Sequence, residues 1–329
     1  MKRIISIVLV SILALTLLAS CGKKETTVVT FGEAGWDSMK FHNAVAMFIA
    51  EKAYDMETKE VSGTTQITYN ALKTGDILVY METWTDNIDS YKEDVVAGSV
   101  LELGLNYADN AQGLYVPRYV IEGDAERGIE PMAPDLKSVT DLADYADLFK
   151  DPDDPSKGRV YGSISGWAAD EIMRKKVEFY GLDAMYNYMD PGSDAALSAA
   201  IAGAYEKGEP IVAYYWEPTW LSGKYDLVIL EDAPYDPDKF PTGETAFPSV
   251  QLTVCVNPDF KKENPEFCEF LSKYETSSAL TSEALLYIQD NDLDDYIVAA
   301  KWFLQEHDEL LSQWLPDEKA ELVRKALIS

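Results

Sequence analysis

Four of the seven tryptophans lie beside short turns, where predicted strands end: Trp36, Trp84, Trp167 and Trp216. In open α/β sheets, ligands bind beyond the carboxyl ends of the strands, and large apolar side chains there expose unfavourable surface unless something covers them. A quaternary ammonium group has no hydrogen-bond donor, so a protein holds it by shape and by the negative faces of aromatic rings. The four tryptophans therefore predict an aromatic cage for such a cation.

A quaternary ammonium ligand that is also a betaine carries a carboxylate, which needs hydrogen-bond donors. The turn after Gly166 opens a predicted helix, so the backbone N–H groups of Ala168 and Ala169 are candidates to bind this carboxylate at the helix N-terminus. Arg118, in a Val-Pro-Arg-Tyr-Val segment, is a second candidate. The alternative for Arg118 is an ordinary solvated arginine.

The elements that position these residues form two series in which strands alternate with helices. The first series comprises strands at 28–32, 57–61 and 77–81 and helices at 38–54 and 66–74. The second comprises strands at 160–164, 211–215 and 227–230 and helices at 168–180 and 195–207. Such alternation is typical of βαβ units and a mostly parallel sheet. The sequence therefore predicts the α/β class.

Two lobes follow from the length of the chain and from the order of these series. A chain of 329 residues is large for a single hydrophobic core. We expect strands at 111–120 and 251–256 to be the crossings between lobes. Residues 27–117 and 250–329 then form lobe 1, residues 118–249 form lobe 2, and the ligand cleft lies between them.

The N-terminus reads as an export signal. Met1-Lys2-Arg3 precedes an apolar run at 4–18, and Leu18-Ala19-Ser20-Cys21 resembles the bacterial lipobox. Residues 1–20 are then a lipoprotein signal peptide, Cys21 carries the lipid (such as palmitate), and residues 21–26 are a tether to the extracytoplasmic face of the cell membrane. The alternatives are a secretory signal with a chance cysteine, or an uncleaved membrane anchor.

Charge and composition exclude several classes of function. Twenty-eight basic residues stand against 57 acidic ones, a net charge of −29, which argues against nucleic acid as a partner. His42 and His307 lie far apart without ligand spacing, so we expect no metal site, no catalytic triad, no cofactor and no enzyme activity. Cys255 and Cys268 leave a disulfide open. Trp302 and Trp314 lie at helical spacing among apolar residues and are expected in the core.

Three tryptophan-bearing segments carry a family resemblance: 79–86, 161–169 and 213–222. They resemble the glycine betaine, proline betaine and choline binding proteins of ABC importers, as does Thr245-Ala246-Phe247-Pro248. The resemblance implies a periplasmic-binding-protein-like fold, a small quaternary-ammonium ligand, and a permease and ATPase complex as partners. It implies a cage of Trp84, Trp167 and Trp216, joined by Trp36 and Tyr115 as in choline-preferring members. Ser165 and Ala168-Ala169 depart from the family pattern, in which Pro and then Gly-Cys or polar residues are common.

Two other functions are weighed against this one. A binding protein of the same build for an amino acid or a polyamine would use carboxylates beside the aromatic residues, and Glu33, Asp37, Glu82 and Glu217 are close enough in sequence. A lipid-anchored hydrolase needs a nucleophile with a base, and the sequence offers no such pair. The choice among glycine betaine, proline betaine, choline and carnitine stays open.

Overall fold

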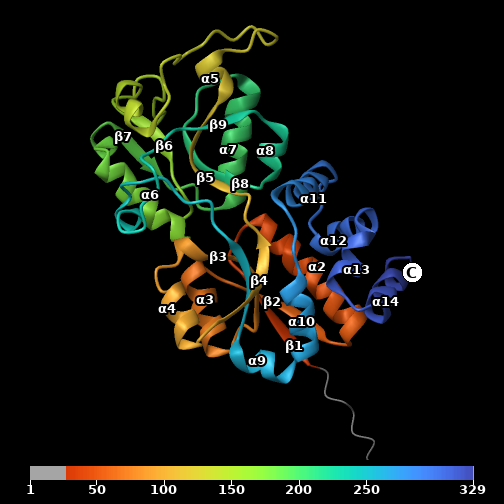
Figure 1. The fold of residues 1–329 in the computed structure, drawn as a ribbon. Helices are drawn as coiled ribbons and strands as arrows, with labels where there is room; N and C mark the ends of the chain where they lie inside the picture. The colour runs from red at the N-terminus through yellow and green to blue at the C-terminus, as the bar shows by residue number, and fades with distance from the viewer. Residues whose placement is uncertain (1–26, 329) are drawn as a thin grey trace, which may run out of the picture.

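The computed structural model describes residues 27–328, which form two lobes, each built on one five-stranded sheet (Figure 1). The first sheet has the order β2 (Glu57–Ser62), β1 (Val28–Glu33), β3 (Val79–Trp84), β10 (Leu252–Val256) and β4 (Leu101–Tyr107). The second has the order β7 (Tyr186–Met189), β6 (Gly158–Tyr161), β8 (Ala213–Glu217), β5 (Ala111–Pro117) and β9 (Leu227–Ile229). The predicted α/β class and the two-lobed build are confirmed.

Helices cover both faces of the first sheet. On one face, α2 (Asp37–Tyr54) packs with the C-terminal helices, and β1 contributes Val29 and Phe31 to the shared core. On the other face lie α3 (Thr65–Thr74) and α4 (Tyr91–Ala97), packed around Tyr80. Successive strand residues point to opposite faces, so β3 supplies both cores from adjacent positions.

The C-terminal helices belong mainly to the first lobe. They are α9 (Pro258–Glu263), α10 (Pro265–Lys273), α11 (Ser278–Asp290), α12 (Tyr296–Glu306), α13 (Asp308–Trp314) and α14 (Asp317–Leu327). Helices α12 and α14 pack on α2, whereas α11 also contacts α8 of the second lobe (Figure 1). Trp314 is fully buried, as predicted, and Trp302 stacks on Tyr287 with ring centroids 4.0 Å apart at the margin of the core.

The second lobe carries four α-helices around its sheet: α5 (Arg118–Glu122), α6 (Ala168–Phe179), α7 (Asp194–Lys207) and α8 (Trp220–Lys224). Strands β6, β7 and β8 are parallel, and β5 runs antiparallel to β8 and β9. Two strands were not predicted from the sequence: β7 in the second lobe and β4 in the first.

The boundary expected at residue 117 is wrong. Strand β5 pairs with β8 from Ala111 to Tyr115 and with β9 up to Pro117, so it belongs to the second sheet. The crossing therefore precedes Ala111. The expected strand 111–120 is also too long, because the chain turns into α5 after Pro117, and the Arg118 N–H donates to the Asp226 carbonyl.

The two crossings between the lobes lie side by side. Ser249 Oγ donates to the Ala108 carbonyl at 2.8 Å, and Asn110 Oδ1 accepts a hydrogen bond from the Val250 N–H at 3.0 Å. These hydrogen bonds join the two connecting segments to each other at the junction of the lobes. The strand expected at 251–256 is not itself a crossing, because β10 pairs with β3 and β4 within the first sheet and follows the return crossing.

Two further features of residues 27–328 concern the cysteines and the apolar character of the helices. Cys255 and Cys268 are both buried free thiols, so the disulfide that the sequence left open is absent from the structure. Within residues 27–328, no helix combines the length and the apolar character needed to cross a membrane.

Candidate functional site

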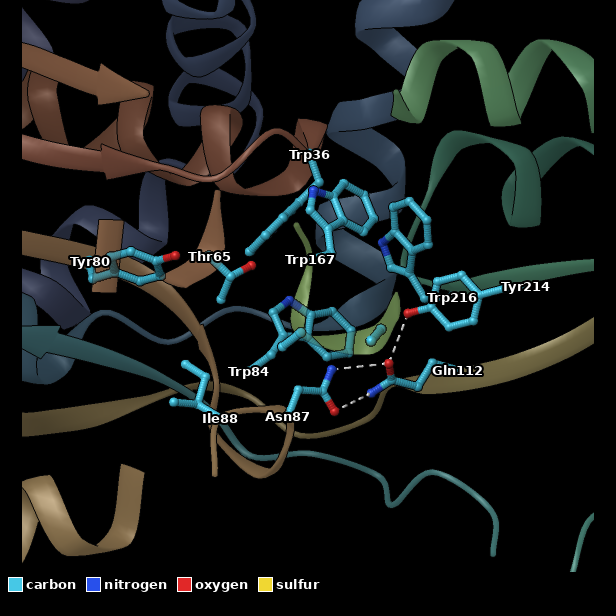
Figure 2. A pocket seen from close by; sticks show the side chains of 12 residues that line it. Trp36, Thr65, Tyr80, Trp84, Asn87, Ile88, Gln112, Trp167, Tyr214 and Trp216 are labelled. Atoms are coloured by element: carbon cyan, nitrogen blue, oxygen red, sulfur yellow. Dashed lines mark hydrogen bonds between the residues drawn. The ribbon is translucent and has the colours of Figure 1, made fainter. Parts of the chain in front are cut away.

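The four predicted tryptophans line one cavity between the lobes (Figure 2). Trp36 and Trp84 come from the first lobe, and Trp167 and Trp216 come from the second. Only about 30 Å³ of the cavity is open to the centre of a water-sized molecule, which is enough for a water or two, so the rings lie nearly closed on one another. Trp84 and Trp216 lie at the ends of β3 and β8, whereas Trp36 and Trp167 lie in the turns that lead from β1 and β6 into a helix.

The tryptophan rings meet edge to face. The Trp167 ring centroid lies 5.4 Å from that of Trp36, at an interplanar angle of 81°. It lies 5.0 Å from that of Trp216, at 76°. Tyr214 stacks on Trp216 at 6.0 Å and 29°. Edge-to-face packing holds neighbouring rings at right angles, so the group presents ring faces to the cavity from several directions.

A Gly-Trp pair at the start of a helix positions two of the rings. Gly35 has φ +99° and Gly166 has φ +90°, conformations that favour glycine. In each case the next residue, Trp36 or Trp167, is the extended N-cap residue of a helix. The two turns face each other, because a Cβ on Gly35 would lie 3.4 Å from Trp167 Nε1.

The lobes touch at the second of these turns. The Thr65 N–H, in the first turn of α3, donates to the Gly166 carbonyl at 3.2 Å. A Cβ on Gly166 would lie only 2.6 Å from Thr64 Cγ2. This contact leaves no room for a side chain at Gly166, so the turn and the start of α3 close one side of the cavity.

A polar network forms another wall of the cavity (Figure 2). Gln112 Oε1 accepts hydrogen bonds from Asn87 Nδ2 at 3.2 Å and from the Tyr214 hydroxyl at 2.9 Å. Asn87 belongs to the first lobe and Gln112 to β5 of the second. Sequence reasoning missed these residues, although a single glutamine within the otherwise apolar β5 was a usable signal.

Ala168 and Ala169, predicted at a helix N-terminus, do line the cavity. They open α6, whose N-cap residue Trp167 makes no side-chain cap hydrogen bond. First-turn N–H groups have no partner within their own helix, and the helix dipole favours an anion there. This end of the cavity can therefore bind an acceptor group.

Tyr115 and Arg118 do not reach the cavity, contrary to the expectation. Side chains alternate along a strand, so Gln112 faces the cavity while Tyr115 faces the opposite side of β5, where its hydroxyl donates to Glu217 Oε1 at 3.4 Å. Arg118 lies beyond the end of the strand at the surface, where its Nε donates to Asp226 Oδ2 at 2.8 Å.

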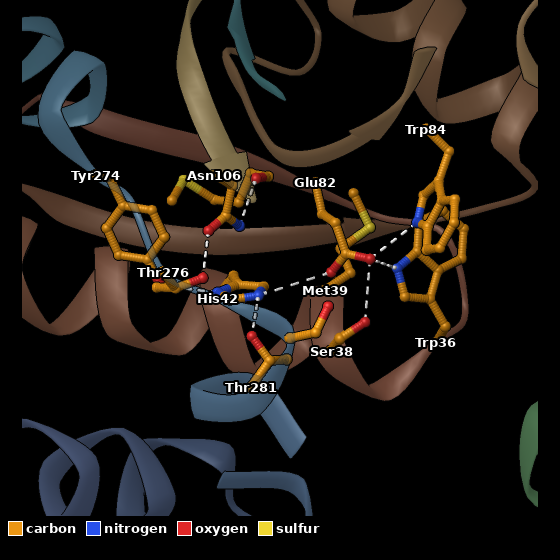
Figure 3. Close-up of polar contacts among 12 residues, drawn as sticks. Trp36, Ser38, Met39, His42, Glu82, Trp84, Asn106, Tyr274, Thr276 and Thr281 are labelled. Carbon is orange, nitrogen blue, oxygen red and sulfur yellow. Dashed lines mark hydrogen bonds and ion pairs between the residues drawn. The ribbon is translucent and has the colours of Figure 1, made fainter. Parts of the chain in front are cut away.

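A buried carboxyl lies behind the cage (Figure 3). Glu82 Oε1 accepts hydrogen bonds from Trp36 Nε1 at 3.0 Å, from Trp84 Nε1 at 2.8 Å and from Ser38 Oγ at 3.0 Å. Burial raises the pKa of Glu82 to about 7, although these hydrogen bonds act to lower it. Sequence reasoning considered Glu82 only as a polyamine contact and missed its place behind the rings.

His42 lies next to this carboxyl, with its Nε2 3.9 Å from Glu82 Oε2. Burial lowers the pKa of His42 to about 3, so the ring is neutral near neutral pH and supplies no positive charge. Its Nδ1 lies 2.8 Å from the Tyr274 hydroxyl. His42 is thus a buried structural side chain of the first lobe.

Known proteins resemble this chain in sequence and in fold. A family model described as the substrate binding domain of ABC-type glycine betaine transport systems matches residues 27–305. A glycine betaine/carnitine transport binding protein of Listeria monocytogenes is 24% identical over 176 residues, which are 53% of this chain and 54% of that protein. The match thus spans about half the length of this curated relative.

Solved structures share the fold over nearly the whole chain. A glycine betaine/L-proline binding protein from Borrelia burgdorferi has a TM-score of 0.71 at 21% identity, covering 90% of this chain and 100% of that one. An ABC-transporter choline binding protein in complex with choline has a TM-score of 0.70 at 22% identity, covering 91% and 98%. A lactococcal protein in its closed form with glycine betaine has a TM-score of 0.65 at 20% identity, covering 88% and 100%.

Proposed function

This chain belongs to the family of substrate-binding domains of ABC-type glycine betaine transport systems, and on that premise we propose that its interlobe cavity binds a small quaternary-ammonium compound. The observation that carries the proposal is the group of four tryptophans, two from each lobe, around one cavity. Each ring face near a cation contributes about 1 kcal/mol, and more where water is excluded. Trp36, Trp84 and Trp216 are each less than a tenth exposed.

The lining of the cavity argues against the other ligand classes. Among the described residues that line it, none is Asp, Glu, Lys or Arg. A polyamine or an amino acid carries ammonium groups that donate hydrogen bonds, and these groups need charged or polar partners once water is removed. Glu82, one of the carboxylates weighed from the sequence, accepts the indole N–H bonds of Trp36 and Trp84 through Oε1 and is not among the residues that line the cavity.

Two groups can bind the other end of the ligand. The first turn of α6 suits a carboxylate, and the Asn87–Gln112 pair suits either a carboxylate or a hydroxyl. The proposal therefore includes glycine betaine and choline.

Lobe closure links binding to transport. The cage has two rings from each lobe, and Thr65 contacts Gly166 across the cleft, so a ligand between the rings favours the closed arrangement. The membrane partner is an ABC permease with its ATPase, which distinguishes the closed from the open form. We propose rotation at the paired crossings near Asn110 and Val250 as the motion.

Residues 1–26 lie outside the described part of the chain, so the signal peptide, the tether and Cys21 rest on sequence alone. Lipidation at Cys21 would hold the protein at the extracytoplasmic face of the cell membrane, where an importer meets its binding protein.

A ligand panel tests the function. Thermal shift followed by calorimetric titration should show binding of at least one of glycine betaine, proline betaine, choline and carnitine, and no binding of putrescine or glutamate. The same titrations with the Trp84→Ala and Trp216→Ala variants serve as the site control. Binding of putrescine or glutamate, with no binding of any quaternary amine, would overturn the proposal.

A further inference from the structure

We propose that Glu82 is the positioning residue of the cage and the counter-charge to the bound cation, so that binding of the cation is coupled to loss of a proton from Glu82. The inference rests on the proposed function, because it concerns the same cavity. It adds a charged group that does not contact the ligand, and a dependence of affinity on pH.

The positioning role follows from the hydrogen bonds. An indole has a single N–H donor, which lies in the plane of its ring. Trp36 and Trp84 both direct this donor to one oxygen, Oε1 of Glu82, at 3.0 and 2.8 Å (Figure 3). Each hydrogen bond therefore fixes the direction in which the N–H edge of its indole ring points. Edge-to-face packing against Trp167 restricts the Trp36 ring further.

The same bonds strengthen the attraction for a cation. Hydrogen bonds between buried groups polarise one another, and their effect is larger where the dielectric constant is low. A carboxylate that accepts an indole N–H bond raises the electron density of the ring and so the negative potential on its face. One buried charge therefore acts on two of the four rings.

No positive group of the protein compensates this carboxylate. Glu82 is fully buried, and among residues 27–328 its only ion-pair partner is His42, which is neutral near neutral pH. Its second oxygen, Oε2, is buried and makes no hydrogen bond of ordinary length, although the Tyr107 hydroxyl lies close enough to act to lower the pKa of Glu82. An unpaired charge in such a place is unfavourable until a cation arrives.

The other titratable groups that face Glu82 are phenols: Tyr80, Tyr107 and Tyr274. Burial raises the pKa of each above its ordinary value, so all three are neutral across the physiological range. Glu82 is therefore the group in this cluster that changes its charge near neutral pH.

Coupling to the ligand follows from the charge. Because burial raises the pKa of Glu82 to about 7, both its protonated and its ionised forms are accessible near neutral pH in the ligand-free protein. A cation in the cage favours the ionised form and so lowers this pKa, and the proton leaves. By linkage, the affinity for the cation rises as the pH rises through the pKa of Glu82. The total increase is about tenfold for each unit by which the bound cation lowers the pKa of Glu82.

A second buried carboxyl provides the matched control. Asp194 begins α7 near the junction of the lobes, and its pKa is also raised, first by burial and then by Asp37. Lys40, which pairs with Asp37 at 3.2 Å, acts in the opposite direction. Asp194 accepts hydrogen bonds from Ser198 Oγ at 3.0 Å and from the Asp37 backbone. The Asp194→Asn variant removes the titration and keeps an amide oxygen that can accept both bonds.

The experiment is calorimetric titration of the mature chain with choline and with glycine betaine, neither of which titrates near neutral pH. Runs at about pH 6 and about pH 8.5, in buffers of different ionisation enthalpy, measure affinity and proton release. For the wild-type protein we expect affinity to rise about tenfold with pH, with release of a fraction of a proton near neutrality. Glu82→Gln keeps an acceptor oxygen for the indoles but has no charge, so its affinity should be weak and independent of pH. Asp194→Asn should keep the wild-type profile.

Other outcomes of these titrations would overturn the proposal. A wild-type protein that binds either cation without proton release and with equal affinity at both pH values overturns the coupling, and this readout needs no variant. A Glu82→Gln protein that retains the wild-type pH profile, or an Asp194→Asn protein that loses it, assigns the coupling to another group. If neither cation binds at any pH, the proposed function itself fails.

Discussion

Replacement of Gly166 by alanine tests whether contact between the lobes is part of ligand binding. The new Cβ would lie 2.6 Å from Thr64 Cγ2, whereas carbon atoms pack at about 3.5–4 Å. Thr64 Cβ would lie 3.1 Å away, so either the Thr64 side chain turns away or the lobes separate by about 1 Å at this point. Separation breaks the hydrogen bond from the Thr65 N–H to the Gly166 carbonyl, now 3.2 Å long.

The free-energy cost of Gly166→Ala has two parts. The positive φ of +90° at Gly166 costs an alanine roughly 1–2 kcal/mol in any state of the protein. Loss of the hydrogen bond costs about 1 kcal/mol more, and only in the closed form. We therefore expect ligand affinity to fall about fivefold, since 1.4 kcal/mol corresponds to a factor of about ten. The loss of stability from the positive φ does not depend on the ligand.

Gly181 offers a matched control at the other end of α6. Its φ is +65°, and a Cβ there would meet nothing within 4 Å. Gly181→Ala should therefore lose similar stability by thermal unfolding and bind the ligand like wild type in calorimetric titration. Equal affinities for Gly166→Ala and wild type, or equal losses of affinity in both variants, would refute the role of lobe contact.

Three further predictions concern the cage, its carboxyl and the anchor. Trp84→Ala and Trp216→Ala should each weaken ligand binding by roughly 1–3 kcal/mol in calorimetric titration. Trp302→Ala should instead lower the melting temperature with little change in affinity. Wild-type affinity in both Trp84→Ala and Trp216→Ala would show that these tryptophans do not bind the ligand. Because the pKa of Glu82 is raised from 4.5 to about 7, its contribution to stability is fully present below pH 4.5 and is lost as pH rises through about 7. Ligand-free Glu82→Gln should thus be more stable than wild type at alkaline pH, by up to about 3 kcal/mol in denaturant titration, and a difference that does not vary with pH would contradict this. Cys21→Ser should abolish palmitate labelling in a bacterial host, and persistent labelling would count against the lipobox.

The sequence alone identified much of the aromatic site. Residue type and position at or after the end of a predicted strand were enough to select Trp36, Trp84, Trp167 and Trp216, because both are local properties of the chain. Alternation of strands and helices was likewise enough for the α/β class and two lobes, since it depends on local hydrophobic periodicity.

Tertiary structure decided the rest. The partners of a strand come from distant parts of the chain, so no local pattern placed β5 in the second sheet. Once β5 is paired there, its two-residue period turns Gln112 toward the cavity and Tyr115 away from it. The chemistry of Glu82 depends on the same long-range packing: its sequence neighbours do not reveal that it is fully buried or that it accepts a hydrogen bond from a tryptophan 46 positions away. Burial and hydrogen bonding set a pKa, and both exist only after the chain has folded.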